Sequence, residues 1–365
     1  MNFEVMRKVM RLQSQDESTL FPILSFLIFI LTFAMMHYPT TANPDEAKPT
    51  KSEIEDTLTL KALVTNLPSS WTLNISPDNF LFVTHKAGEL AKYSLSGDLL
   101  AKVDLLLNGL YYKGQGGLSA IAFHPDYAST PWIYLSYSSG SDSANGLKVV
   151  RVLLGSTPLA SGELATINNK LSVYRKETIF ESLDLRGTAV HYGARLAFMA
   201  DNSLLISTGD GFDYRESAQK KSSDMGKILR LADTDRIPSN NPFVKAEIFF
   251  EKAIYSLGHR NPQGLIVMPN NQVIANEHGP AGGDEINIIK PGYNYEWPVT
   301  TQGKDYIGSL ITPFTRYEGM QQPNINWTPS IGPSVMVFYG ADALPPFANR
   351  LLVTSLTLSN YMGLY

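Results

Sequence analysis

The chain contains no cysteine among its 365 residues. This absence excludes disulfides, thiolate nucleophiles, zinc ribbons and iron–sulfur clusters together. It leaves the cellular compartment open, because a chain of this length can bury a sufficient core without covalent cross-links.

An excess of basic charge is also lacking. The 30 Lys and Arg residues against 34 Asp and Glu residues give a net charge of −4, and no run of basic residues interrupts this balance. Nucleic acids and anionic surfaces require basic patches, so neither is an expected partner. With 44% hydrophobic and 18% charged residues, the chain is too apolar for an intrinsically disordered protein.

Helical periodicity is almost missing from residue 58 onward, where residues 222–230 are the one expected helical turn. Two motifs of other enzyme classes are missing as well. No Gly-x-Ser-x-Gly lies between a strand and a helix, and no Gly-x-Gly-x-x-Gly opens a βαβ unit. These absences exclude the α/β-hydrolase and dinucleotide-binding folds.

An apolar run at residues 20–36 follows Arg7, Lys8 and Arg11 and precedes a polar stretch at residues 39–52. This layout is typical of a signal peptide or a single N-terminal anchor. A buried core helix is disfavoured, because the run shows no amphipathic period. We therefore expect export to the periplasm or the extracellular space, with cleavage and anchoring both left open.

We divide the chain into an N-terminal signal or anchor (residues 1–42), a polar linker (residues 43–57) and one large domain (residues 58–365). Within that domain, strands alternate with turns rich in Pro, Asp and Asn, which tolerate tight backbone turns. The clearest examples are residues 75–84, 121–137, 196–207 and 265–275, with a last strand at residues 350–355. Hairpins repeating at intervals of several tens of residues predict an all-β propeller rather than a sandwich.

The hairpins also predict which polar residues face each other. Facing residues in an antiparallel pair have numbers with a constant sum, because one strand runs up as the other runs down. The hairpin at residues 196–207 thereby places His191 opposite Asp210, and the next one places Asn261 opposite His278. Gln115 lies at the corresponding open end of another hairpin, so we expect these side chains to gather at one end of the propeller.

Three features in these regions carry chemistry. His191 beside Asp210 can act as a base with an orienting carboxylate, although a surface His near a turn Asp is the alternative for an isolated pair. Arg260 can bind a planar carboxylate ligand or form a loop salt bridge. Residues 277–285 form an irregular loop rich in the oxygen atoms that calcium prefers, which by itself is a weak metal signal.

A set of short stretches in this region resembles the soluble pyrroloquinoline quinone (PQQ)-dependent glucose and aldose sugar dehydrogenases, the glucose/sorbosone dehydrogenase family. The stretches follow the family order and together are highly specific: residues 114–118, 123–126, 191–196, 208–210, 258–264, 277–280, 283–287 and 293–298. The resemblance implies a six-bladed β-propeller that holds PQQ in a central funnel. It also implies oxidation of an aldose at the anomeric carbon to the lactone, with electrons passed to an external acceptor.

The resemblance assigns roles by position. His191 corresponds to the general base that removes the anomeric proton, and Asp210 to the acid that orients it. The remaining assignments are Gln115 and Arg260 for the sugar, Arg260, Asn261, His278, Ser330 and Gly332 for the cofactor, and the carbonyl groups of Gly279 and Pro280 for Ca²⁺. The calcium ion would polarise the quinone as a Lewis acid.

Two departures from the family pattern affect the expected cofactor site. The family commonly has a lysine at the position of Thr357, and this sequence stops at Tyr365. We therefore expect an incomplete last blade with exposed strand edges. Each lost charge-assisted contact would cost about 1.5–3 kcal/mol of cofactor binding.

Two other functions share the fold. A catalytically weakened propeller could bind a glycan or a protein, as the hedgehog-interacting relatives do, but those relatives are rich in cysteine. A calcium-dependent lactonase would not account for residues 258–264. Trp297 and Trp327 are candidates for stacking on a sugar ring or for packing.

Overall fold

The computed structural model describes residues 31–33, 62–156 and 171–356, and almost all of its regular structure is β-strand. The first sheet contains β2 (Ser70–Ile75), β3 (Leu81–His85), β4 (Glu89–Tyr93) and β5 (Leu99–Asp104). The second contains β6 (Leu118–Phe123), β7 (Ile133–Gly140), β8 (Asn145–Ser156) and β9 (Leu171–Glu181). The third contains β10 (Gly193–Phe198), β11 (Leu204–Thr208), β12 (Lys227–Leu231) and β13 (Ile254–Leu257).

The fourth sheet contains β14 (Pro262–Val267), β15 (Val273–Glu277), β16 (Asp284–Ile289) and β17 (Ile325–Trp327). A fifth, three-stranded sheet joins β18 (Pro333–Tyr339) and β19 (Arg350–Ser355) to β1 (Leu31–Phe33). The described helical segments are short: α3 (Phe249–Ala253) and the 3₁₀ turns η1 (Arg215–Gln219) and η2 (Pro345–Phe347).

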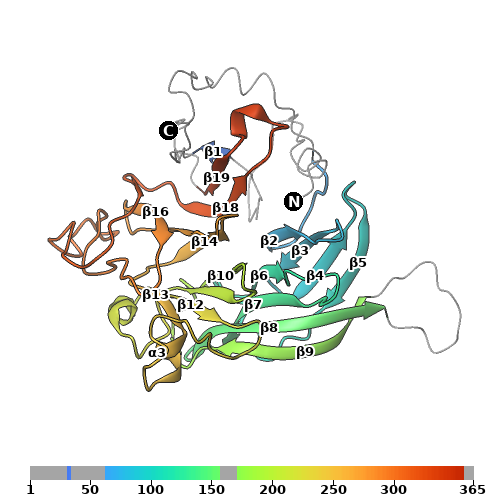
Figure 1. Cartoon of the computed structure of the whole chain (residues 1–365), viewed down its shortest axis with the longest axis horizontal. Helices are drawn as coiled ribbons and strands as arrows, with labels where there is room; N and C mark the ends of the chain where they lie inside the picture. Colours follow the sequence, from blue (N-terminus) through green and yellow to red (C-terminus); the bar gives the residue numbers. More distant parts are fainter. Residues whose placement is uncertain (1–30, 34–61, 157–170, 357–365) are drawn as a thin grey trace, which may run out of the picture.

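The sheets follow one another around a central point in chain order (Figure 1). Their first strands lie nearest the centre, where β2 contacts β6, β6 contacts β10, β10 contacts β14 and β14 contacts β18. This radial arrangement confirms the predicted all-β propeller. The structure shows four four-stranded sheets and the three-stranded one, so the count of six blades stays a prediction.

Apolar layers hold neighbouring sheets together. Alternate residues of β7 face opposite neighbours, with Ile133 and Leu135 packed towards the first sheet and Tyr134 towards the third. Equivalent layers join the third sheet to the fourth and the fourth to the fifth. The inner strands β3, β11 and β15 are buried at every residue, so they appear in the sequence as nearly continuous apolar runs.

The expected helical turn at residues 222–230 is wrong. Lys227–Leu231 forms β12, whose five residues are all buried between β11 and β13. Lys227 lies in this strand and donates through Nζ to the backbone carbonyl groups of Ser217 and Ala218 in η1 and of Met225. Arg230 instead binds side chains at the turn that ends β10.

Only residues 31–33 of the N-terminal apolar run fall in the described part, where they form β1 beside β19. The remainder of the predicted signal or anchor, the linker and Thr357 lie outside the described residues. Within the described ranges, no helix is long and apolar enough to cross a membrane.

Candidate active site

The predicted hairpin registers are confirmed at their open ends. Gly193 pairs with Thr208, and Pro262 pairs with Glu277, which gives the sums expected for the two hairpins. Beyond these last pairs, the chain leaves the ladder and presents polar side chains. The backbone N–H of Asp210 then donates to the carbonyl of Arg260 at 2.8 Å, which ties the two hairpin ends together.

His191 and Asp210 form a buried pair at this end. Nδ1 of His191 lies 2.8 Å from Oδ1 of Asp210, and the residues are 6% and 0% exposed. The Asp210 contact occupies Nδ1, which leaves Nε2 as the ring nitrogen that can accept a substrate proton. His191 also has a left-handed backbone, with φ 55°, and its N–H donates to Oε1 of Gln115 at 2.8 Å.

Burial and charge favour a neutral imidazole beside an ionised carboxylate. Burial lowers the pKa of His191; the hydrogen bond to Asp210 opposes this shift, while the charges of Arg260 and Arg186 add to it. For Asp210, burial alone would raise the pKa, but the hydrogen bonds from His191 and from the N–H of Phe212 and the charge of Arg260 lower it. A neutral base with a charged orienting group is the state needed to remove a proton.

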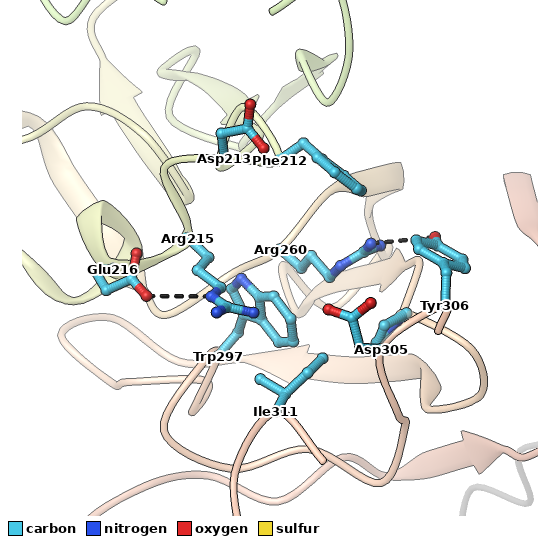
Figure 2. A pocket seen from close by; sticks show the side chains of 10 residues that line it. Phe212, Asp213, Arg215, Glu216, Arg260, Trp297, Asp305, Tyr306 and Ile311 are labelled. Atoms are coloured by element: carbon cyan, nitrogen blue, oxygen red, sulfur yellow. Dashed lines mark hydrogen bonds and ion pairs between the residues drawn. The ribbon is translucent and has the colours of Figure 1, made fainter. Parts of the chain in front are cut away.

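A cavity of about 260 Å³ is lined by Phe212 and Trp297, which both contact this pair, and Figure 2 shows its lining side chains. Its walls include the rings of Phe212, Trp297 and Tyr306 together with the guanidinium of Arg260. Phe212 joins the cavity to the buried pair, because its ring lies 5.2 Å from that of His191. The lining also carries the guanidinium of Arg215 and the carboxylates of Asp213, Glu216 and Asp305, so the space combines flat apolar surfaces with charges of both signs.

Several contacts fix Arg260. Nη1 donates to the carbonyl oxygens of His278 and Gly279 at 3.1 and 2.6 Å, and Nη2 donates to the Tyr306 hydroxyl at 3.2 Å. Its backbone N–H donates to Glu277 Oε2 at 2.6 Å. Arg260 is only 4% exposed, so its charge acts inside the cavity wall rather than in bulk water.

The other predicted cofactor residues are held by protein contacts. Oδ1 of Asn261 accepts from the N–H of Gly193 at 3.1 Å, and Nε2 of His278 donates to the carbonyl of Pro333 at 2.7 Å. Ser330 and Gly332 both bind the buried carboxylate of Asp284, at 3.1 and 2.8 Å. Of the full predicted set, Arg260 and Pro280 line the cavity.

The predicted calcium ligands are backbone oxygens. The Gly279 carbonyl accepts from Arg260, and the Pro280 carbonyl accepts from Ser330 Oγ at 3.1 Å. In the part of the chain that the structure describes, no group of three or more His, Asp or Glu side chains could hold a metal. A cation here would depend on these carbonyl groups, which are oxygen donors of the kind that calcium takes and retain a second lone pair each.

Sequence reasoning missed Phe212 and Tyr306, and it offered Trp297 only for stacking on a sugar ring or for packing. Trp297 donates from Nε1 to Oδ2 of Asp210 at 2.8 Å, so it belongs to the pair and is not only packing. Phe212 and Tyr306 are stacked 6.2 Å apart at 16° beside the cavity. Phe212 follows the Gly-Asp-Gly turn directly, which was its one local signal, whereas Tyr306 lies in a loop without any recognisable pattern. Trp327, the other candidate for stacking, lies in β17 and packs against the core.

The chain is similar to known proteins over most of its length. The family model for Glucose / Sorbosone dehydrogenase matches residues 67–364. Aldose sugar dehydrogenase YliI of Escherichia coli K12 is 35% identical over 306 residues, which are 82% of this chain and 78% of that protein.

Two solved structures are similar to the fold as well. The soluble aldose sugar dehydrogenase of Escherichia coli in its apo form gives a TM-score of 0.70 at 34% identity, covering 80% of this chain and 81% of that one. The PQQ-bound aldose sugar dehydrogenase of Streptomyces coelicolor gives a TM-score of 0.59 at 28% identity, covering 76% and 73%.

Proposed function

The chain belongs to the glucose/sorbosone dehydrogenase family, and on that basis we propose that it oxidises aldose sugars at the anomeric carbon to the lactone, with PQQ and Ca²⁺ as cofactors. The observation that carries the proposal is the buried His191–Asp210 pair beside a cavity that Arg260 lines. The PQQ-bound Streptomyces structure supports the choice of cofactor.

His191 is the proposed general base. Its neutral Nε2 would take the proton of the anomeric hydroxyl, and Asp210 would stabilise the imidazolium that results. Trp297 and the backbone N–H of Phe212 keep the Asp210 carboxylate in place through further hydrogen bonds. Gln115 holds the backbone of His191, so its proposed sugar contact would come in addition to a positioning role.

Arg260 is the proposed anchor for the anionic cofactor, because its guanidinium is a fixed cation between aromatic walls. The carbonyl groups of Gly279 and Pro280 would hold the calcium ion. When bound, PQQ supplies a two-electron acceptor for the hydride from the sugar carbon, and calcium increases its electrophilicity. Proton and hydride leave the same carbinol, so the protein needs no covalent nucleophile.

The proposal is tested by adding PQQ and calcium to the purified full chain and following dye reduction with a panel of aldoses. We expect PQQ binding that depends on calcium and turnover of at least one aldose. Arg260→Met should weaken PQQ binding. The control is Arg230→Met in β12, which changes an arginine bound to Asp201 in the turn after β10 and should leave PQQ binding unchanged. Failure of the wild-type chain to bind PQQ would refute the proposal.

Export to the periplasm or extracellular space and transfer of electrons to an external acceptor complete the proposal. Export is proposed from the N-terminal apolar run. The external acceptor is proposed from the redox balance, since reduced cofactor must be reoxidised in each cycle. Fractionation of cells that produce the full chain would test the location.

A further inference from the structure

Beyond the last ladder pair of the β10–β11 hairpin, two backbone segments approach each other closely. A Cβ atom placed on Gly209 would lie 2.0 Å from the carbonyl oxygen of His191, so only glycine fits there. The carbonyl oxygens of His191 and Gly209 share one side-chain donor in this region, and the Gly209 carbonyl also accepts from the backbone N–H of Gly226 at 3.2 Å. Asp210 follows Gly209 directly. The separation of the His191–Asp210 pair therefore depends on how these two carbonyl groups are held.

Arg186 supplies that donor. Its Nη1 lies 2.8 Å from the carbonyl oxygen of His191 and 3.5 Å from that of Gly209. The second contact is long, so the His191 contact is the stronger of the two. The guanidinium is therefore in contact with both segments that carry the proposed catalytic pair.

The Arg186 side chain is tightly enclosed. The residue is 1% exposed, and its guanidinium lies 4.9 Å from the ring centre of Tyr192. A Cβ atom on Gly211 would lie 3.0 Å from its Cδ atom. Its own backbone is paired with that of Asn145 at the start of β8, in both directions at 2.9 Å. The guanidinium thus links the second sheet to the open end of the third.

This link acts on a residue in an unfavourable backbone conformation. A non-glycine residue with φ near +55° is held there only by its surroundings. His191 is held at three groups: its N–H by Gln115, its carbonyl by Arg186 and its Nδ1 by Asp210. Arg186 also contacts the carbonyl of Gly209, the residue directly before Asp210.

We propose that Arg186 is a positioning residue for the His191–Asp210 pair, holding the imidazole and the carboxylate in register by contacting the carbonyl groups of His191 and Gly209. Its effect on turnover rests on the proposed function, because it acts through His191 and touches no reacting atom. Its effect on the imidazole does not depend on any cofactor.

The charge of Arg186 adds an electrostatic consequence. The charged or titratable groups acting on the imidazole are Asp210, Arg260, Arg186 and His278. Burial is the main cause that lowers the pKa of His191, and the charge of Arg186 lowers it further. Replacing Arg186 with a neutral side chain should therefore raise the pKa of His191.

The test compares Arg186→Met with the wild type by NMR titration of the His191 imidazole in the full chain without cofactor. We expect the His191 midpoint to move to higher pH. In the loaded enzyme we expect kcat to fall about tenfold or more while KM changes little, because the sugar contacts remain. The acid limb of the kcat profile should move to higher pH by the same amount as the imidazole midpoint.

Arg195→Met is the matched control. Arg195 is also a buried arginine, but its guanidinium donates to Thr72 rather than to the pair. We expect it to alter stability while leaving the His191 midpoint in place. If Arg186→Met does not fold, Arg186→Lys decides the question: it keeps the charge but cannot contact both carbonyl groups in the same way, so kcat should fall with a nearly unchanged midpoint.

An unchanged His191 midpoint and unchanged kcat in folded Arg186→Met would overturn the proposal. So would an equal midpoint shift in Arg195→Met, since that would indicate a general effect of removing a buried charge. If the wild-type chain oxidises no aldose, the proposed function fails, and the titration still decides whether Arg186 controls the imidazole.

Discussion

Asp210→Asn tests the proposed catalytic pair most selectively, because it removes a charge while keeping the shape of the side chain. Oδ1 of Asp210 accepts from His191 Nδ1 at 2.8 Å and from the N–H of Phe212 at 2.9 Å. Oδ2 accepts from Trp297 Nε1 at 2.8 Å. An asparagine has only one acceptor oxygen. Its NH₂ group, which is a donor, must therefore face either the indole N–H of Trp297 or Nδ1 of His191, and that contact is lost or changed.

The expected loss can be estimated from these contacts. One charge-assisted hydrogen bond contributes about 1.5–3 kcal/mol. Each 1.36 kcal/mol corresponds to a factor of ten in rate, so kcat/KM should fall about 10- to 150-fold. The assay is dye reduction by the enzyme loaded with PQQ and calcium, with Asp201→Asn at the turn end of the same hairpin as the control.

The pH dependence gives a second readout of the same change. His191 acts as a base when neutral, so activity is lost as the pH falls through its pKa. Asp210 raises that pKa through its hydrogen bond and its charge, and Asp210→Asn should therefore move the acid limb to lower pH. An acid limb that moves to higher pH, or wild-type turnover with an unchanged profile, would refute the reasoning.

Three further predictions concern the same site and protein stability. Arg260→Met should weaken PQQ binding about 10- to 150-fold in an absorbance titration, because a charge-assisted contact is lost; an unchanged Kd would contradict the assignment. Gly209→Ala should lower the free energy of unfolding by about 1–3 kcal/mol in denaturant titration, since its Cβ would overlap the carbonyl of His191, and wild-type stability would show that the backbones separate freely. The pKa of Asp210 is lowered in the folded state, so its ionised form stabilises the fold above its unfolded pKa of about 3.9, and this stabilisation is lost as the pH falls through the folded pKa. In urea titrations, the stability advantage of wild type over Asp210→Asn should therefore shrink below about pH 4. An advantage that grows below this pH would contradict the lowered pKa.

The sequence predicted the hairpins and their facing residues well. Turn position fixes strand register, and a register error of one residue would turn every side chain to the opposite face. The pairs His191–Asp210 and Asn261–His278 could therefore be placed before any contact was known. The propeller class followed from the spacing of those same turns.

The contacts that complete the site could not be predicted in this way. Trp297 reaches Asp210 across 87 residues of sequence, and Tyr306 reaches Arg260 from a loop without periodicity. The sequence pattern predicts Lys227 near a helix end, because a strand with a buried lysine has no distinctive local pattern. Its carbonyl partners lie in η1 and just before β12, at Ser217, Ala218 and Met225. Such contacts depend on how loops from separate blades meet, which local spacing does not encode.

Anaerobic single-turnover reduction of bound PQQ by an aldose, compared between wild type and His191→Ala, tests the central role of His191 most directly. Loss of a general base slows such a step by about 10²- to 10⁴-fold, so we expect that slowing with an unchanged Kd for PQQ. Reduction of PQQ by His191→Ala at the wild-type rate would contradict the account.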